Sequence, residues 1–142
     1  MSLTKFIDNL KKFDLEKELL RVVKDNERVI IDLNTEEQLF QKGIDSKGNV
    51  LPGPYAPFTI EIKRAKGQPT DRITLKDEGD FHGSFFVDAG SFPIRIDASD
   101  SKRNKLVAEW GEDIFGLTPE SMTELRKNVL PDLQIIQRAK LL

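Results

Sequence analysis

His82 is the one histidine of the chain, and it stands between Phe81 and Gly83. Metal sites with imidazole ligands need several ligands, and a histidine that acts as a general base needs a nucleophile held within hydrogen-bond reach. A lone histidine cannot build the first, and nothing in the sequence supports the geometry of the second. We therefore expect His82 to be structural or simply exposed.

Carboxylates are plentiful, but no spacing singles out an acid–base couple among the 24 acidic residues. Asp45-Ser-Lys47-Gly-Asn49 has some features of a calcium loop, yet Lys47 stands where an acid or amide ligand is required, so this stretch predicts a turn. The chain has no cysteine, and no glycine-rich nucleotide-binding motif occurs in it. We expect no catalytic residue, no metal and no cofactor.

Basic residues form the most compact candidate for binding. Lys63, Arg64 and Lys66 lie beside Gly67, and Arg72 is near. Such a segment could contact an acidic protein or, without sequence preference, a phosphate backbone. The pI of about 5.5 argues against a dedicated DNA reader, and ordinary solvated lysines remain the alternative. We name these four residues as candidate partner contacts.

Charge is unevenly distributed along the 142 residues. Residues 42–76 carry seven basic side chains against three acidic ones, and residues 77–120 carry ten acidic against four basic. A polar molecule of this kind can bind copies of itself or complementary surfaces, although solvated loops would show the same pattern.

The hydrophobic fraction of 38% predicts a lean core for one domain. No apolar run is long enough to span a bilayer and no signal peptide is evident, so we expect synthesis and folding in the cytoplasm.

The first 41 residues are predicted to be helical. Leu3, Phe6, Ile7 and Leu10 recur at i, i+3, i+4 and i+7, and Asp14 is placed to cap a second helix. The pattern leaves open whether this region is one long helix with a break or two helices.

Glycine and proline then mark residues 42–76 as an extended arm or loop. Within it, Phe58–Lys63 alternates like a strand but could equally be a short helix. Residues 77–98 predict a hairpin of strands Ser84–Val87 and Phe92–Ile96, with Pro93 indicating an edge strand.

Residues 99–142 predict a short helix that ends at Gly111 and a C-terminal helix that begins at Thr118-Pro119-Glu120. Pro131 must kink this helix or begin a new one. The order of elements predicts a single α+β domain over residues 1–142.

One segment resembles a known family. It reads Pro54-Tyr-Ala-Pro57-Phe-Thr59-Ile60-Glu-Ile-Lys63, then Gly67, then Leu75-Lys-Asp77-Glu-Gly79-Asp80-Phe81 and Ser84-Phe-Phe86. This segment resembles the tail-completion and head–tail-joining proteins of tailed phages, with Phe58, Glu78 and Phe81 as departures from the usual pattern.

The resemblance implies a non-enzymatic virion protein of the neck or tail, made in the cytoplasm of a bacterial host. It implies a homo-oligomeric ring that contacts connector, tail-terminator or tail-tube proteins, with non-specific contact with genomic DNA as a further possibility and no membrane. It also implies that the arm reaches over a neighbouring subunit and becomes ordered on assembly. A small phage-encoded enzyme or toxin such as a nuclease, and a monomeric adaptor, are the alternative functions.

Overall fold

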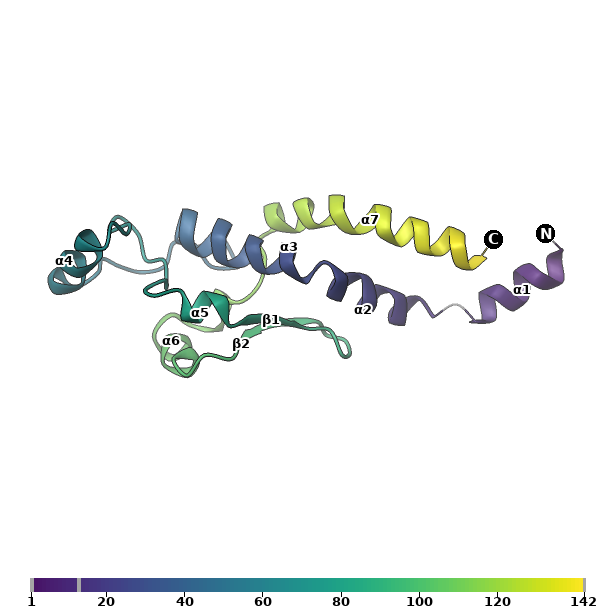
Figure 1. Ribbon diagram of the computed structural model, residues 1–142, viewed down its shortest axis with the longest axis horizontal. Coiled ribbons are helices and arrows are strands. Elements are labelled where there is room, and N and C mark those ends of the chain that lie inside the picture. Colours follow the sequence, from purple (N-terminus) through teal and green to yellow (C-terminus); the bar gives the residue numbers. More distant parts are fainter. Residues whose placement is uncertain (1, 13, 142) are drawn as a thin grey trace.

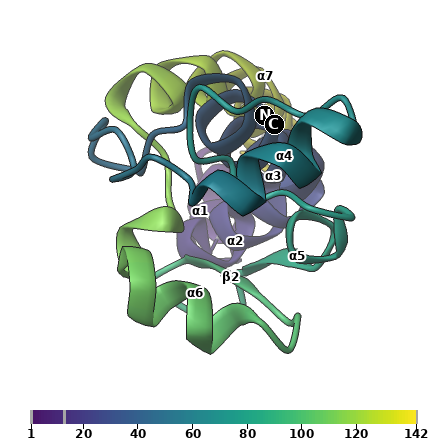
Figure 2. The same ribbon diagram turned by 90° about the vertical axis from the view of Figure 1, so that its left-hand side faces the viewer.

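The computed structural model describes residues 2–12 and 14–141, except for the side chains of residues 136, 137 and 139–141. The molecule is elongated and layered (Figure 1). Its middle layer is a row of helices, α1 (Leu3–Lys12), α2 (Leu15–Asp25), α3 (Glu27–Asp32) and the wider helix η1 (Leu33–Lys42). Helix α7 (Pro119–Leu141) lies along one side of this row, and a β-hairpin lies along the other (Figure 2). The α+β class expected from the sequence is confirmed.

The N-terminal region consists of separate helices and not of one. Asp14 caps α2 as predicted, because its carboxylate accepts a hydrogen bond from the Lys17 amide at 3.1 Å. Only Asn26 separates α2 from α3, and η1 follows α3 directly. In η1 the helix widens to i→i+5 hydrogen bonding, and its last turn ends at Gly43 with φ +63°.

Two buried amides on η1 position the segment that leads into α7. Asn34 donates to the carbonyl of Ile114 and accepts from the amide of Gly116, both at 2.9 Å. One turn later, Gln38 donates to the carbonyl of Gly116 and accepts from the amide of Thr118, again both at 2.9 Å. The side chains therefore act as a short strand would, satisfying the backbone of residues 114–118 on both its donors and its acceptors. We call this arrangement the amide clamp.

The hairpin pairs β1 (Phe85–Asp88) with β2 (Arg95–Ala98) in antiparallel register, with Phe85 opposite Ala98. The predicted second strand, Phe92–Ile96, was therefore placed too early in the sequence; β2 is an edge strand, as expected, but Pro93 is not part of it. Pro93 has no N–H to contribute to a ladder, and it lies in the loop between the strands.

The outer edge of β1 is closed by two side chains from the helical row. Glu27 accepts a hydrogen bond from the Val87 amide at 2.7 Å, and Lys24 donates to the Val87 carbonyl at 3.0 Å. Lys24 and Glu27 also pair with each other at 2.7 Å, and these hydrogen bonds hold the pKa of Glu27 below its usual range. The edge of β2 has no such cover in the described part of the chain, so it remains the edge available for strand pairing.

Residues 42–76 do not form an extended arm. Pro57–Ala65 is a helix, α4, which decides the open question about Phe58–Lys63 and fits proline at the first helical position. Leu51, Ile73 and Leu75 from the irregular stretches on either side are buried in the main core. The apolar residues of this segment therefore anchor it to its own chain and hold α4 at one end of the molecule (Figure 1).

The remaining helices close the core around the hairpin. They are α5 (Asp80–Gly83), α6 (Arg103–Trp110) and the short 3-10 helix η2 (Glu112–Ile114). The buried members of the core cluster are Leu39, Leu51, Ile73, Leu75, Phe81, Phe85, Ala98 and Ile114.

As predicted, Thr118 caps α7, since its hydroxyl accepts a hydrogen bond from the Ser121 amide at 3.2 Å. Pro131 lies inside α7 and does not start a new helix. No helix in the described residues is both long and apolar enough to cross a membrane.

Candidate functional site

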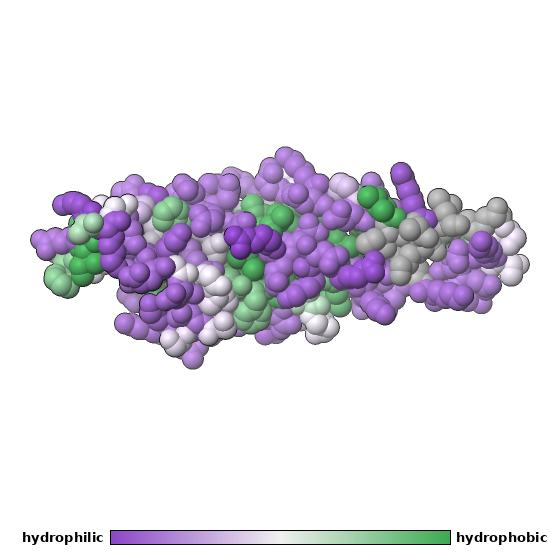
Figure 3. Space-filling view, viewed as in Figure 1, coloured by the Kyte–Doolittle hydropathy of each residue, from purple (hydrophilic) through white to green (hydrophobic). Residues whose placement is uncertain are grey.

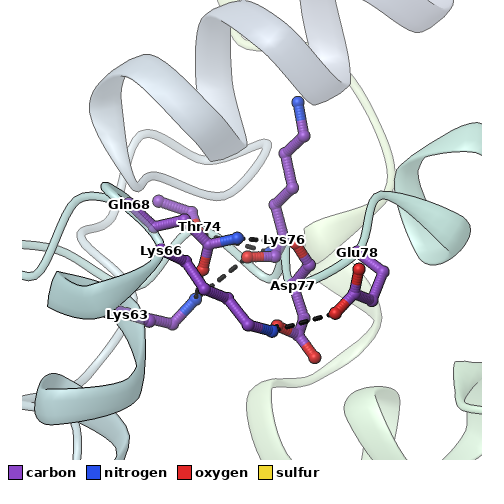
Figure 4. A network of polar contacts seen from close by, with 7 residues as sticks. All are labelled: Lys63, Lys66, Gln68, Thr74, Lys76, Asp77 and Glu78. Atoms are coloured by element: carbon purple, nitrogen blue, oxygen red, sulfur yellow. Dashed lines mark hydrogen bonds and ion pairs between the residues drawn. The ribbon is translucent and has the colours of Figure 1, made fainter.

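Lys63 is the first of the four predicted contact residues, and it is buried, with 7% of its surface exposed. Its ammonium group donates to the carbonyl of Lys76 at 2.9 Å and to the side chain of Gln68 at 3.4 Å (Figure 4). It also lies 4.8 Å from the centre of the Tyr55 ring, a cation–π distance. The structure therefore uses the Lys63 charge within the chain, to fasten α4 to the segment that follows it.

Lys66 fastens the same two segments from the solvent side. Its ammonium group pairs with Asp77 at 2.7 Å and with Glu78 at 2.9 Å (Figure 4). The hydrogen bonds that Lys66 donates to the two carboxylates raise the pKa of Lys66, and the one to Asp77 lowers the pKa of that carboxyl group. Lys66 is thus a neutralised cation in this conformation.

Arg72 points toward η1. Its Nε donates to the carbonyl of Phe40 at 2.7 Å, and its terminal nitrogen pairs with Asp71 at 2.7 Å. Lys76 lies 4.8 Å from the centre of the same Phe40 ring. Arg72 therefore stabilises the junction between η1 and the irregular segment that contains buried Ile73, and only part of its charge faces solvent.

Arg64 differs from the other three. It is exposed on α4, and its side chain makes no hydrogen bond or ion pair with the described part of the chain. The structure does not gather the four basic residues into one patch. A contact of these residues with a partner stays a prediction, and Arg64 is the member whose charge is available for it.

A matched pair of substitutions separates the two roles. Lys63→Met is expected to lower the free energy of unfolding by about 1–2 kcal/mol, because the carbonyl of Lys76 loses its charged donor. Arg64→Met, on the exposed face of the same helix, should change it by less than about 0.5 kcal/mol. Urea titrations that give midpoint and slope measure both. Equal effects from the two substitutions would contradict the internal role of Lys63.

Helix α4 also presents apolar surface. Phe58 is 72% exposed and Ile62 is 39% exposed. Figure 3 shows this hydrophobic surface at the end of the molecule. A hollow of about 440 Å³ separates α4 from α6, and Ile62, Leu106 and Trp110 contribute its apolar lining.

A larger hollow, of about 530 Å³, is a groove on the side of the helical row. We call it the flank groove. Its apolar lining comes from four regions, namely the helical row, the hairpin, the loop after η2 and the first turns of α7. The apolar side chains are Val23, Ile30, Val87, Ile94, Ile96, Phe115, Leu117, Met122 and Leu125. Most of them are only half-buried, so the groove is an open apolar surface.

At the opposite end from α4, helix α1 contacts α7, and the apolar face that the sequence predicted stays largely exposed. Leu3, Phe6, Ile7 and Leu10 are exposed by 73%, 37%, 40% and 46%, and α1 has no buried residue. Isolated helices of this length are marginal in water and normally need an apolar partner.

The side chains that could act in catalysis or metal binding are instead hydrogen-bonded to the backbone of the chain. His82 is buried, and its Nε2 donates to the carbonyl of Thr74 at 2.9 Å. The turn predicted at Asp45 is confirmed, because its carboxylate accepts from the amides of Lys47 and Asn49 at 2.9 and 3.0 Å. Within the residues that the structure describes, no cluster of three histidine or acidic side chains is placed to hold a metal ion.

Sequence reasoning missed two features of these surfaces. The flank groove is built from segments that lie far apart in the sequence, so no local sequence pattern predicts it. The amide clamp left a signal, since Asn34 and Gln38 stand four residues apart on one helix, next to the apolar residues Leu33 and Leu39.

Comparison of the chain with protein-family models, with curated proteins and with solved structures finds no match. The function is therefore inferred from the surfaces described above and from the resemblance of residues 54–86.

Proposed function

We propose that this chain is a non-enzymatic virion protein of a tailed phage or prophage, a ring-forming subunit of the neck or the tail terminus. Its partners would be copies of itself and the adjoining connector, tail-terminator or tail-tube proteins. It would be made in the bacterial cytoplasm and incorporated into the virion.

The observation that carries the proposal is the exposed apolar face of α1 at one end of an elongated molecule. A second apolar surface, on α4 with Phe58 and Ile62, lies at the other end. Large exposed apolar side chains gathered on helices are typical of protein interfaces. Two such surfaces at opposite ends suit a subunit that contacts a neighbour on each side.

The resemblance adds a second line of support. Residues 54–86 contain α4, the turn at Gly79 and the start of β1. In this chain the same residues hold α4 in place, through Lys63 and Lys66 on one side and buried Leu75 and Phe81 on the other. The segment that resembles the phage family is thus the segment that presents the apolar end of the molecule.

Light scattering on the purified chain tests the proposal. The mass is measured over a concentration series, alone and with the connector and tail proteins encoded beside it. We expect a mass several times that of the 16.2 kDa chain, either alone or after a neighbouring protein is added. A chain that stays monomeric with every neighbour would overturn the proposal and favour the adaptor.

A further inference from the structure

The outer edge of β2 carries open backbone groups, and the hydrogen bonds of the hairpin show which ones they are. In an antiparallel ladder, residue pairs that exchange hydrogen bonds alternate with pairs that do not. The amide of Ser99 donates to the carbonyl of Ser84 at 3.2 Å, whereas Val87 uses its amide and its carbonyl for side chains of the helical row. Because Val87 lies opposite Ile96, the amide and the carbonyl of Ile96 point away from β1.

These two groups of Ile96 are uncovered. Figure 1 shows β2 on the side of β1 away from the helical row. Neither group has a hydrogen-bond partner within residues 2–12 and 14–141. At the next outward position of β2, the amide of Ala98 binds the carboxylate of Asp97 at 2.8 Å, so the amide of β2 that stays open is that of Ile96. A sheet edge with an open donor and an open acceptor is a template for another strand.

The sequence of β2 fits a second copy of β2. If two copies pair antiparallel about a two-fold axis at Ile96, the two Ile96 residues exchange both of their open hydrogen bonds. Arg95 of each copy then lies directly opposite Asp97 of the other, and opposite charges at such positions attract. Sliding the strands by two residues places either Arg95 opposite Arg95 or Asp97 opposite Asp97, and sliding them by one residue misaligns the donors and acceptors. The charges therefore favour one register.

Both charged groups are available for this contact. Arg95 is exposed, and although Asp88 lies opposite it in the hairpin, Arg95 forms no ion pair within the described residues. The carboxylate of Asp97 accepts on Oδ1 from Arg103 at 2.7 Å and from the amide of Ala98 at 2.8 Å. Its Oδ2 receives only a long contact from Arg103, at 3.5 Å. Oδ2 can thus accept a hydrogen bond from a second arginine.

We propose that two copies of the chain pair through β2, antiparallel about a two-fold axis at Ile96, so that their hairpins form one four-stranded sheet. The same surface is used on both copies, so the contact is isologous. It uses neither α1 nor α4, and it therefore goes beyond the ring proposed above and does not depend on it. A strand of four residues gives a small interface, so the dimer should dissociate on dilution.

Disulfide cross-linking tests the register, because the chain has no cysteine of its own. In the proposed pair the two Cα atoms of residue 96 lie about 5.5 Å apart, which a disulfide can bridge. We expect Ile96→Cys to give a disulfide-linked dimer on oxidation. The control is Phe86→Cys, at a position of β1 that is 39% exposed. Its two copies lie at least about 14 Å apart across the four-stranded sheet and should give at least about tenfold less dimer. Equal amounts from the two variants would overturn the proposal.

A charge reversal tests the contact without a cross-link. Arg95→Glu places a carboxylate opposite Asp97 twice in each dimer, so the dissociation constant measured by sedimentation equilibrium should rise about tenfold. Lys105→Glu makes the same change of charge at an exposed position of α6 and should leave the constant within about twofold. A constant that responds equally to both substitutions would show that the strand register is wrong.

The strand contact and the proposed function fail separately. A dimer that links through residue 96 but forms no larger assembly, alone or with neighbouring proteins, would support the strand contact and overturn the ring. A chain that is monomeric alone at every concentration but assembles with its neighbours would overturn the strand contact and leave the proposed function standing.

Discussion

Replacing Asn34 by alanine is expected to lower the free energy of unfolding by about 3 kcal/mol, one of the largest effects of a single substitution in this chain. Asn34 is fully buried and satisfies the carbonyl of Ile114 and the amide of Gly116. The substitution leaves both backbone groups without a partner in a buried site, and each orphaned group costs roughly 1–3 kcal/mol. Gln38→Ala should have a similar effect, because it releases Gly116 and Thr118 in the same way.

Urea unfolding of three variants measures the amide clamp. Gln41→Ala, at an exposed position of the same helix η1, is the matched control and should change the free energy of unfolding by less than about 0.5 kcal/mol. The double variant Asn34→Ala with Gln38→Ala should lose less than the sum of the single effects, since the first loss already lets water reach the loop. A loss below about 1 kcal/mol for Asn34→Ala at unchanged slope would show that the clamp contributes little.

The amide clamp also positions one wall of the flank groove. Residues 114–118 enter the flank groove through Phe115, Gly116 and Leu117, and they set the start of α7. If Asn34 or Gln38 is lost, the wall of the groove moves together with Met122 and Leu125. In clamp variants the loss of stability should therefore be accompanied by a change in the shape of the groove, whereas changes on the exposed face of α1 should leave stability nearly unchanged and affect self-association alone.

Local signals in the sequence were sufficient for the helix starts. Asp14 and Thr118 cap the helices that their residue types predict, because a cap depends only on the next three residues. The hairpin was found but its second strand was misplaced, since apolar Phe92 and Ile94 fit a strand pattern and the register depends on the partner strand. The alternation of apolar and polar residues in Phe58–Lys63 fits a strand. The segment is nevertheless a helix, which agrees with Pro57 at the first helical position and with the packing around it.

Long-range contacts account for what the sequence could not predict. Lys63 has the type and the neighbours of a solvated lysine, yet it is buried because a carbonyl and an aromatic ring from other parts of the chain receive its charge. The segment 42–76 has the composition of a mobile arm, yet three of its apolar residues complete the core. The candidate surfaces have the same origin, since the flank groove combines four segments that no single window of sequence contains.

The second large effect expected is a dependence of the free energy of unfolding on pH, and it comes from His82. Burial lowers the pKa of His82 from 6.5 to about 4, and nearby Lys76 and Lys63 act in the same direction, against Thr74 and Glu36. A histidine whose pKa is depressed by folding stabilises the native state fully above its unfolded pKa. This stability is lost as pH falls from 6.5 toward 4, because only the unfolded chain takes up the proton in that interval.

The free energy of unfolding should therefore fall by about 2 kcal/mol between roughly pH 7 and pH 5, and His82→Gln should remove most of this fall. Glutamine keeps an amide donor for the carbonyl of Thr74 and does not titrate. Glu27, Asp77 and Asp97 have lowered pKa values, so their contributions are lost only at still lower pH and do not obscure the interval. Urea titrations of both chains at a series of pH values measure the slope. If the free energy of unfolding falls equally steeply with pH in the natural chain and in the His82→Gln variant, another group titrates between pH 7 and pH 5. The buried neutral histidine is then not the cause of the fall.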